Sequence, residues 1–263
     1  MNNNIDKRAI VCEGAVIGEG SIIEPNAYIG SNVIIGKNCK VMSNAYITGN
    51  TIIGDNNNIF PGAVIGTITQ AIAYAGGESG VVIGNNNNIR EFVTINATEG
   101  DRSDYTRIGD NNLIMAYAHM AHHTVVHNNV VLSNNATLAG HVTVDNNAII
   151  GGLAAVHQFV RIGRFSMTGG KSKIIKDVLP YVKVDGNPSR VFALNIIGFE
   201  RNGFSEDKIE NLKKIFRILF RSGYNVSQAL EQMKTMRCDE SDEIIKFIKD
   251  SERGILFKRN RKS

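Results

Sequence analysis

The clearest pattern along this chain is an apolar residue at every sixth position. The pattern runs without a miss from Val11 to Ile65, resumes at Ile83, slips by one residue near position 100 and continues from Ile108 to Ile162. A helix repeats after about 3.6 residues and a strand alternates after about 2, so neither alone gives this period. Six residues are three strand alternations, and the pattern therefore predicts short strands with a corner after each one.

Short strands that turn the same way at every corner close a triangular coil after about 18 residues, and successive coils then pair like strands about 4.8 Å apart. Gly and Asn tolerate the left-handed backbone conformation that such corners need. Gly often follows the apolar residue, and runs of Asn recur between the strands, as at 56–58 and 85–88. Since the apolar period continues through the Asn runs, we predict an all-β parallel β-helix over residues 1–190 rather than a disordered segment.

Two segments interrupt the pattern. In residues 66–80 the inward positions hold Ala71 and Gly77, and around residues 96–106 the period slips. We interpret both as loops, near 67–80 and 96–107, that project from a regular coil. Long loops on a rigid scaffold often carry function.

The period changes after about residue 190. Apolar residues at 209, 212, 215, 216, 219 and 220 share one helical face, with Ser205 placed to cap the start of a helix and Gly223 to end it. Residues 227–236 and 241–254 are also typical of helices. We therefore predict a small α-helical domain over residues 191–263.

Composition limits the possible functions. The formal net charge of +4 does not require nucleic acid or a membrane as partner, and no apolar run is long enough for a transmembrane segment. The first fifteen residues contain no apolar segment typical of a signal peptide. The three cysteines, Cys12, Cys39 and Cys238, are too far apart for a disulfide framework, so a reducing, cytoplasmic location is expected.

All six histidines fall within residues 119–157. His123 and His141 are 18 residues apart, so they should stack on adjacent coils, while His122 should point outward. The group as a whole should line part of the outside of neighbouring coils. Histidine titrates near neutral pH, which favours either a general base with polar neighbours or a metal site.

Several segments carry a family resemblance. They are NNATLAGHVTVDNNAIIGGLAAVHQFVRIG (134–163), AHMAH (118–122), IREFVTIN (89–96), GNPSRVFALNIIGFERNGFS (186–205) and SERGI (251–255). With the six-residue repeat, they resemble the UDP-N-acetylglucosamine acyltransferases of lipid A biosynthesis, members of the hexapeptide acyltransferases. The resemblance covers nearly the whole chain.

The resemblance implies a left-handed β-helix that forms a homotrimer, with active sites in the clefts between subunits. It implies transfer of a 3-hydroxyacyl chain from acyl carrier protein to the 3-position of UDP-N-acetylglucosamine, with no cofactor. Acyl carrier proteins of this kind are acidic. We expect docking to basic residues near the end of the coil and at the C-terminus, namely Arg161, Arg164, Lys171, Lys173, Lys258, Arg259, Arg261 and Lys262.

The resemblance also implies roles for individual residues. His122 would be the general base, and the backbone N–H of Gly140 would stabilise the oxyanion. Gly170 would set the acyl chain length. The other residues matched to substrate contacts are Gln70, His119, His141, His157, Gln158, Asn195 and Arg201.

The chain departs from the family pattern at the sugar end of the site. Ala71 and Ala73 stand where an acidic residue and a lysine are usual, and His123 follows the base where Asp is usual. Asn96 and Ile197 replace two further contacts. The acceptor therefore stays open, and the alternative is a related acyltransferase with a different sugar-nucleotide acceptor, such as a 3-amino sugar, or with weak turnover.

A zinc hydratase is the alternative from another enzyme class, because β-helices also form gamma-type carbonic anhydrases. His119, His122 and His123 could supply zinc ligands. However, no Asp or Glu lies between Asp110 and Asp145 to orient them. The expectation is therefore that no metal takes part.

Overall fold

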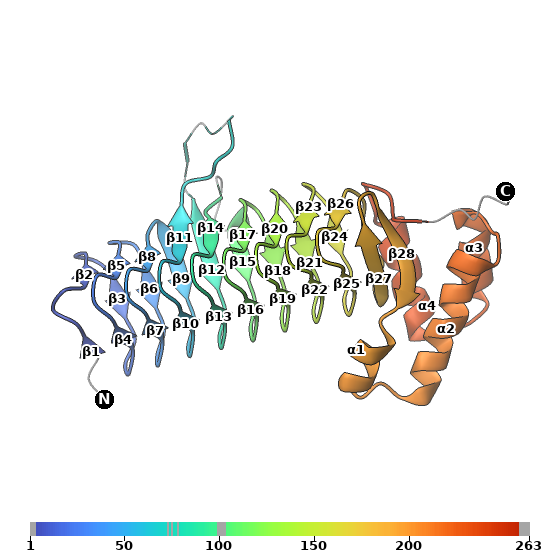
Figure 1. Ribbon diagram of the computed structural model, residues 1–263, viewed down its shortest axis with the longest axis horizontal. Coiled ribbons are helices and arrows are strands. Elements are labelled where there is room, and N and C mark those ends of the chain that lie inside the picture. The colour runs from blue at the N-terminus through green and yellow to red at the C-terminus, as the bar shows by residue number, and fades with distance from the viewer. Residues whose placement is uncertain (1–3, 73, 75, 78, 99–103, 258–263) are drawn as a thin grey trace.

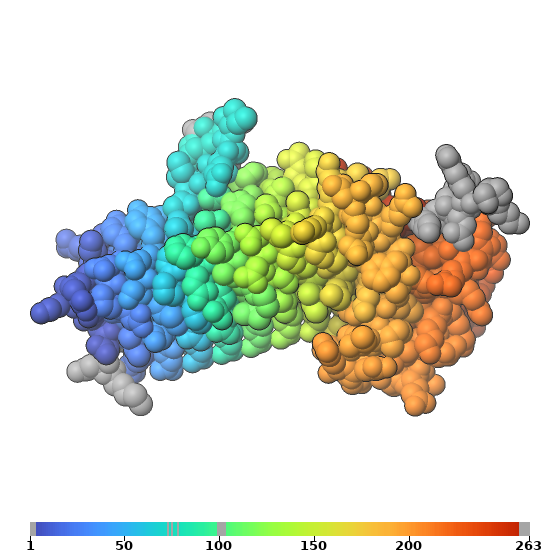
Figure 2. Space-filling model, viewed as in Figure 1, coloured from blue at the N-terminus to red at the C-terminus, as the bar shows by residue number. Residues whose placement is uncertain are grey.

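The computed structural model describes residues 4–257, apart from 73, 75, 78 and 99–103. A long coil of short strands occupies most of the molecule, one loop projects from its side, and helices cluster at its C-terminal end (Figure 1). In the space-filling view the loop stands clear of the coil (Figure 2).

The coil is a parallel β-helix with three sheets. Sheet A has eleven strands: β1 (Asn4–Ile5), β4 (Ile22–Ile23), β7 (Lys40–Val41), β10 (Asn58–Ile59), β13 (Asn88–Ile89), β16 (Leu113–Ile114), β19 (Val131–Leu132), β22 (Ile149–Ile150), β25 (Met167–Thr168), β27 (Val182–Gly186) and β28 (Ser189–Leu194). Sheet B has nine: β2 (Ile10–Val11), β5 (Tyr28–Ile29), β8 (Tyr46–Ile47), β11 (Val64–Thr67), β14 (Thr94–Asn96), β17 (His119–Met120), β20 (Thr137–Leu138), β23 (Ala155–Val156) and β26 (Lys173–Ile174). Sheet C has eight: β3 (Val16–Ile17), β6 (Ile34–Ile35), β9 (Asn50–Ile53), β12 (Gly80–Ile83), β15 (Thr106–Ile108), β18 (Val125–Val126), β21 (Thr143–Val144) and β24 (Arg161–Ile162).

The strand register confirms the predicted coil length. Ile22 pairs with Lys40, and His119 pairs with Thr137, in each case 18 positions further along the chain. Almost every residue of the six-residue pattern from Ile23 onward is buried in the core. The fold class predicted from the repeat is therefore confirmed.

The corners explain the Asn runs. Asn111, Asn129 and Asn147 adopt positive φ values of 57–60° at the same corner of successive coils. A second series of Asn side chains lies inside the coil, where the Asn57 side-chain oxygen accepts from the backbone N–H of Asn87 at 2.9 Å. These stacked amides join one coil to the next, because each satisfies a backbone group of its neighbour.

Both interruptions of the repeat lie at one edge of the coil. Residues 68–79 connect β11 to β12, and residues 97–105 connect β14 to β15, so each replaces a corner between sheet B and sheet C. We call the line of corners between these sheets the B–C edge. The segments predicted as loops at 67–80 and 96–107 therefore both leave the coil at the B–C edge, and residues 73, 75, 78 and 99–103 within them lie outside the described residues.

The C-terminal segment contains four helices, α1 (Ile196–Arg201), α2 (Glu206–Arg221), α3 (Val226–Lys234) and α4 (Asp239–Lys249). Three of them lie where the sequence predicts helices, and the Ser205 side chain caps α2 as expected, by accepting from the backbone N–H of Lys208. The short helix α1 and the β27–β28 hairpin were not predicted. No helix in the described part of the chain is long and apolar enough to cross a membrane.

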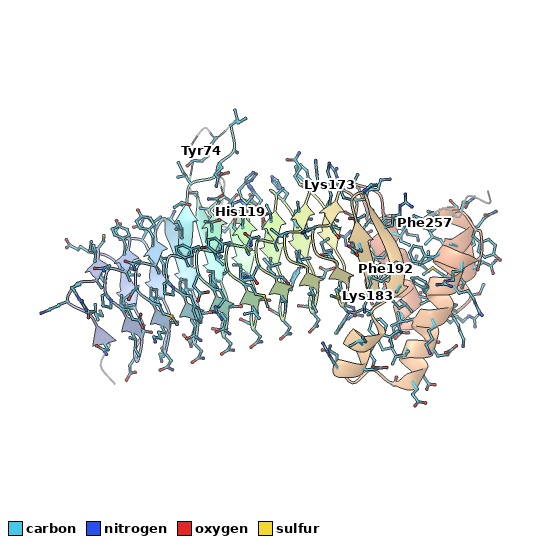
Figure 3. The ribbon with its side chains drawn as sticks, viewed as in Figure 1. Tyr74, His119, Lys173, Lys183, Phe192 and Phe257 are labelled. Atoms are coloured by element: carbon cyan, nitrogen blue, oxygen red, sulfur yellow. The ribbon has the colours of Figure 1, made fainter. Side chains whose placement is uncertain are left out.

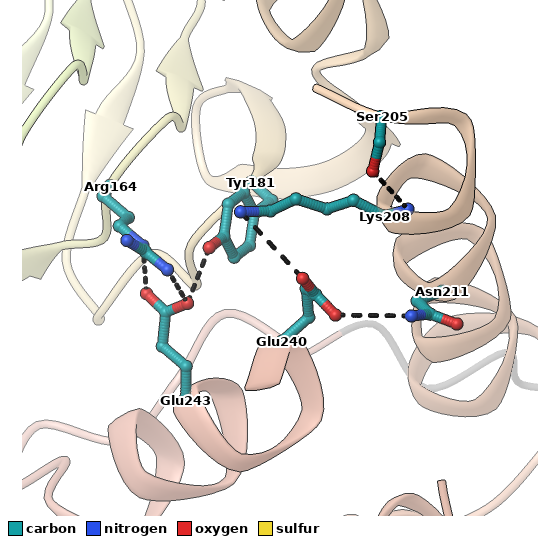
Figure 4. Close-up of polar contacts among 7 residues, drawn as sticks. All are labelled: Arg164, Tyr181, Ser205, Lys208, Asn211, Glu240 and Glu243. Atoms are coloured by element: carbon teal, nitrogen blue, oxygen red, sulfur yellow. Dashed lines mark hydrogen bonds and ion pairs between the residues drawn. The ribbon is translucent and has the colours of Figure 1, made fainter. Parts of the chain in front are cut away.

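Polar contacts join the helices to the coil and to one another (Figure 4). Glu243 of α4 pairs with Arg164 and accepts a hydrogen bond from the Tyr181 hydroxyl at 2.6 Å. Burial, followed by the hydrogen bond to Glu243, raises the Tyr181 pKa, so the phenol stays protonated and keeps donating. In the helical segment Glu240 accepts from Asn211 at 3.4 Å.

Candidate active site

Most of the predicted site residues lie along the B–C edge. Gln70 is in the projecting loop, His119 is on β17, and His122, Gly140 and Gln158 occupy the corners that follow β17, β20 and β23. Figure 3 shows Tyr74 on the same loop and His119 on the coil beside it. The repeat thus brings together residues that are far apart in the chain.

Aromatic rings form a ladder on this edge. His123 and His141 stack with ring centroids 4.3 Å apart and planes 11° apart, and His141 stacks on Phe159 at 4.6 Å. All three residues have positive φ, between 57° and 64°, which directs their side chains outward one above another. The predicted stacking of His123 on His141 is confirmed.

His122 lies beside this ladder. Its Nδ1 is 2.8 Å from Nδ1 of His123, and its ring meets the His141 ring edge-on at 5.2 Å. The 2.8 Å separation is a hydrogen bond, in which one imidazole donates and the other accepts. His123 therefore contacts His122 from the position at which the resemblance leads one to expect a carboxylate.

Gly140 provides the space in which the His122 ring sits. A Cβ at position 140 would lie 2.7 Å from both Cε1 and Nε2 of His122, well inside van der Waals contact. Only glycine lets the imidazole approach the backbone this closely. The Nε2 side of the candidate base therefore faces the peptide that contains the predicted oxyanion donor.

His119 and His141 are the two histidines whose pKa the structure lowers. His119 Nδ1 is 2.7 Å from the Thr94 hydroxyl, and burial lowers the His119 pKa. Burial also lowers the His141 pKa, and the nearby His123 and His122 lower it further. At neutral pH both rings can donate one hydrogen bond and accept another without bringing positive charge into the cluster.

The remaining predicted residues divide between three places. His157 and Gln158 are exposed on the B–C edge, where His157 Nδ1 lies 3.2 Å from the Gln158 carbonyl oxygen. Gly170 is exposed at a corner between sheets A and B. Arg201 and Asn195 line a hollow of about 260 Å³ over sheet A and α1, so one chain does not bring them to the histidines.

Asn195 also has a structural role that the sequence did not indicate. It is buried, and its side-chain amide donates to the Phe165 carbonyl oxygen at 2.9 Å. The hydrogen bond fixes the start of α1, and thereby the position of Arg201, against the coil. Ile197, which replaces a polar contact of the family, is 52% exposed in the same hollow.

Asn96 has a role that sequence reasoning missed. Its amide donates to the Thr67 hydroxyl at 3.1 Å and to the Ile68 carbonyl at 3.3 Å. Asn96 therefore holds the base of the projecting loop that carries Gln70. Ala71 lies in this loop, where its N–H donates to the Thr69 hydroxyl, and Ala73 lies outside the described residues.

Two sequence expectations need refinement. His127 lies on the edge between sheets C and A, 3.8 Å from Asp145, and is not part of the histidine group. Among the residues that the structure describes, the group that could hold a metal is His122, His123 and His141, with ligand atoms within 4.8 Å of one another. The set considered from the sequence had His119 in place of His141.

Of the eight basic residues expected to bind a carrier protein, the four that the structure describes separate into two pairs. Arg164 is ion-paired with Glu243, and Arg161 donates to the Asp250 carbonyl oxygen while its guanidinium covers the Phe247 ring. Both arginines therefore hold the helices. Lys171 and Lys173 are exposed, and Lys258, Arg259, Arg261 and Lys262 lie outside the described residues.

Comparison with known proteins assigns the family. Models of the bacterial transferase hexapeptide match residues 32–67 and 105–140, and domain 2 of the UDP N-acetylglucosamine O-acyltransferase matches residues 177–256. The acyl-[acyl-carrier-protein]–UDP-N-acetylglucosamine O-acyltransferase of Campylobacter concisus is 38% identical over 260 residues, which cover 98% of this chain and 99% of that protein. This chain belongs to the UDP-N-acetylglucosamine O-acyltransferase family. The family predicted from the sequence motifs is confirmed.

Further relatives and solved structures of the family are similar to this chain. The protein of the same description from Synechocystis is 51% identical over 178 residues, 67% of this chain but only 64% of that relative. The match with the Gloeothece citriformis relative likewise spans 64% of that protein. The UDP-N-acetylglucosamine acyltransferase structure from Francisella novicida superposes with a TM-score of 0.94 at 36% identity, over 97% of this chain and 95% of that one. The Bacteroides fragilis acyltransferase gives 0.92 at 41% identity, over 95% and 99%.

Proposed function

We propose that this acyltransferase moves a 3-hydroxyacyl chain from acyl carrier protein to the 3-hydroxyl of UDP-N-acetylglucosamine, the first step of lipid A biosynthesis. The observation that carries the proposal is the contact of His122 with Gly140, on the B–C edge of a fold that matches the family over nearly its whole length. A base and an oxyanion donor side by side are what acyl transfer requires.

In the proposed reaction, His122 Nε2 takes the proton of the acceptor hydroxyl as its oxygen attacks the thioester carbonyl carbon. The carbonyl oxygen becomes an oxyanion, to which the Gly140 N–H donates. The tetrahedral intermediate then collapses, the C–S bond breaks, and His122 returns the proton to the leaving thiolate. One C–O bond forms as one C–S bond breaks, and the proton of the acceptor hydroxyl ends on the leaving thiol. The proposed steps therefore need only residues of the chain and no metal or cofactor.

His123 would orient the base. If Nε2 of His122 is to accept a proton, its Nδ1 must carry one and donate it to Nδ1 of His123, 2.8 Å away. The contact thereby selects the productive tautomer. A neutral imidazole stabilises the resulting imidazolium less than a carboxylate does, so we expect a smaller contribution from this contact than the usual Asp provides.

We further propose a homotrimer. The histidines lie on the B–C edge, whereas Asn195 and Arg201 lie over sheet A. A single substrate can reach both groups if the B–C edge of one subunit faces sheet A of the next. Arg201 would then meet the diphosphate, for which a guanidinium is well suited.

Acyl carrier protein is the proposed donor partner, with the exposed Lys171 and Lys173 as its contacts. Lys173 lies along the coil between His119 and the helices (Figure 3). The three cysteines Cys12, Cys39 and Cys238 are free, which supports the proposed cytoplasmic location.

A 3-amino sugar nucleotide is the second candidate acceptor. It is favoured by Ala71, which offers no polar side chain to the sugar, and by the His123 contact in place of a carboxylate. The deciding experiment incubates purified protein and hydroxyacyl carrier protein with UDP-N-acetylglucosamine or with its 3-amino analogue, and identifies the products by mass. An ester product with the higher kcat/KM supports the proposal, whereas preferred amide formation supports the second candidate. The absence of both products would contradict the proposed function.

A further inference from the structure

Three imidazoles converge on the B–C edge without a carboxylate among them. One ring nitrogen from each of His122, His123 and His141 lies within 4.8 Å of the others, and all three side chains are half-buried. His122 and His123 follow one another at one corner, and His141 is at the corner of the next coil. The distance between the three imidazoles is therefore set by the stacking of adjacent coils, and no loop has to move to bring them together.

The chemistry of this group suits a divalent transition metal. Imidazole is a preferred ligand of zinc, copper and nickel, and zinc–nitrogen bonds of about 2.0–2.1 Å place tetrahedral ligand atoms about 3.4 Å apart. Nδ1 of His122 and Nδ1 of His123 are 2.8 Å apart, so these two atoms would have to separate slightly around a metal ion. Small ring rotations would bring three nitrogens to bonding distance, with water in the fourth position.

We propose that His122, His123 and His141 form a zinc-class metal site whose occupation switches the acyltransferase off. The inhibitory effect rests on the proposed function of His122, but the binding itself does not. A neutral imidazole has one nitrogen lone pair, and a metal bound at either ring nitrogen takes it. His122 can then no longer accept the proton of the acceptor hydroxyl.

Substitution of the family's usual acid by His123 is what creates the third nitrogen ligand. His123 stacks 4.3 Å from His141, so the two rings present their nitrogens to the same space. No Asp or Glu occurs between Asp110 and Asp145 to orient a bound zinc hydroxide for catalysis. The site is consequently assigned to inhibition and not to hydration chemistry.

The test uses the full chain, freed of metal with a chelator and titrated with zinc chloride by calorimetry near neutral pH. We expect one ion per chain, inhibition of acyl transfer with a midpoint equal to the measured Kd, and recovery of activity with EDTA. Absence of binding, or binding without inhibition of an active enzyme, would overturn the proposal. Zinc binding by a protein without transferase activity would instead count against the proposed function alone.

Variants assign the ligands. His141→Asn and His123→Asn should each weaken zinc binding by about tenfold or more, and either one suffices should the other fail to fold. His127→Asn is the matched control, because His127 lies on another edge beside Asp145 and should leave the affinity unchanged. Unchanged zinc affinity in a folded His141→Asn or His123→Asn protein would refute the assignment.

Discussion

A methyl group added at Gly140 should impair catalysis by displacing the base. In Gly140→Ala the new Cβ would lie 2.7 Å from Cε1 and Nε2 of His122, whereas ordinary contacts begin near 3.4 Å. The ring must therefore retreat by the difference, 0.7 Å. Because the new Cβ would meet only the His122 side chain, the backbone can keep its conformation. The imidazole of His122, however, must leave its catalytic position.

The size of the effect follows from positioning. A displacement of about 1 Å at a catalytic centre can cost about 100-fold in rate. We expect kcat of Gly140→Ala to fall by about 10- to 100-fold, or about 1.4–2.7 kcal/mol in activation free energy. KM for the carrier substrate should change little, because the proposed carrier contacts, Lys171 and Lys173, are other residues than the base and its neighbours.

The assay is steady-state kinetics with hydroxyacyl carrier protein and UDP-N-acetylglucosamine, alongside the thermal midpoint of each variant. Gly30→Ala is the control, since its Cβ would meet Thr48 at 3.2 Å in a coil far from the histidines. The control should lose some stability but keep its kcat. If Gly140→Ala keeps kcat within about threefold of wild type, the idea that Gly140 positions His122 is wrong.

Two further predictions concern charge. Burial raises the Asp145 pKa above its unfolded value, so its contribution to stability is present at low pH and lost as pH rises through the folded pKa. Asp145→Asn should therefore raise Tm more at neutral pH than at acidic pH, and an equal change at both would contradict this sign. Raising salt should raise KM for acyl carrier protein with little change in kcat, and the double variant Lys171→Gln with Lys173→Gln should reduce that salt dependence. If KM for acyl carrier protein does not change with salt, the proposal that the carrier docks through charge is wrong.

The repeat made most of the fold predictable. A strict six-residue period specifies strand length, corner position and inward side chains together, and the 18-residue coil then predicts that His123 stacks on His141, as observed. The helix with apolar residues from Ile209 to Phe220 was equally predictable, because its apolar residues share one face and Ser205 caps its start.

What the sequence could not provide were contacts without a fixed spacing. Asn96 reaches Thr67 across an irregular loop, and Arg164 reaches Glu243 from the coil to α4, so no period relates either pair. Arg164 was expected to face a carrier protein because charge alone does not distinguish a docking residue from a paired one. The space that Gly140 leaves for His122 likewise depends on ring orientation, which a repeat does not determine.

The central claim is that His122 is the general base of acyl transfer. It is tested most directly by single-turnover transfer from hydroxyacyl carrier protein to UDP-N-acetylglucosamine by wild-type protein and His122→Ala. The side chain is half-buried at a corner outside the core, so the variant should keep the fold and Tm. The account predicts a rate at least about 100-fold lower, as loss of a general base requires. A folded His122→Ala protein that retains more than about a tenth of the wild-type rate would contradict it.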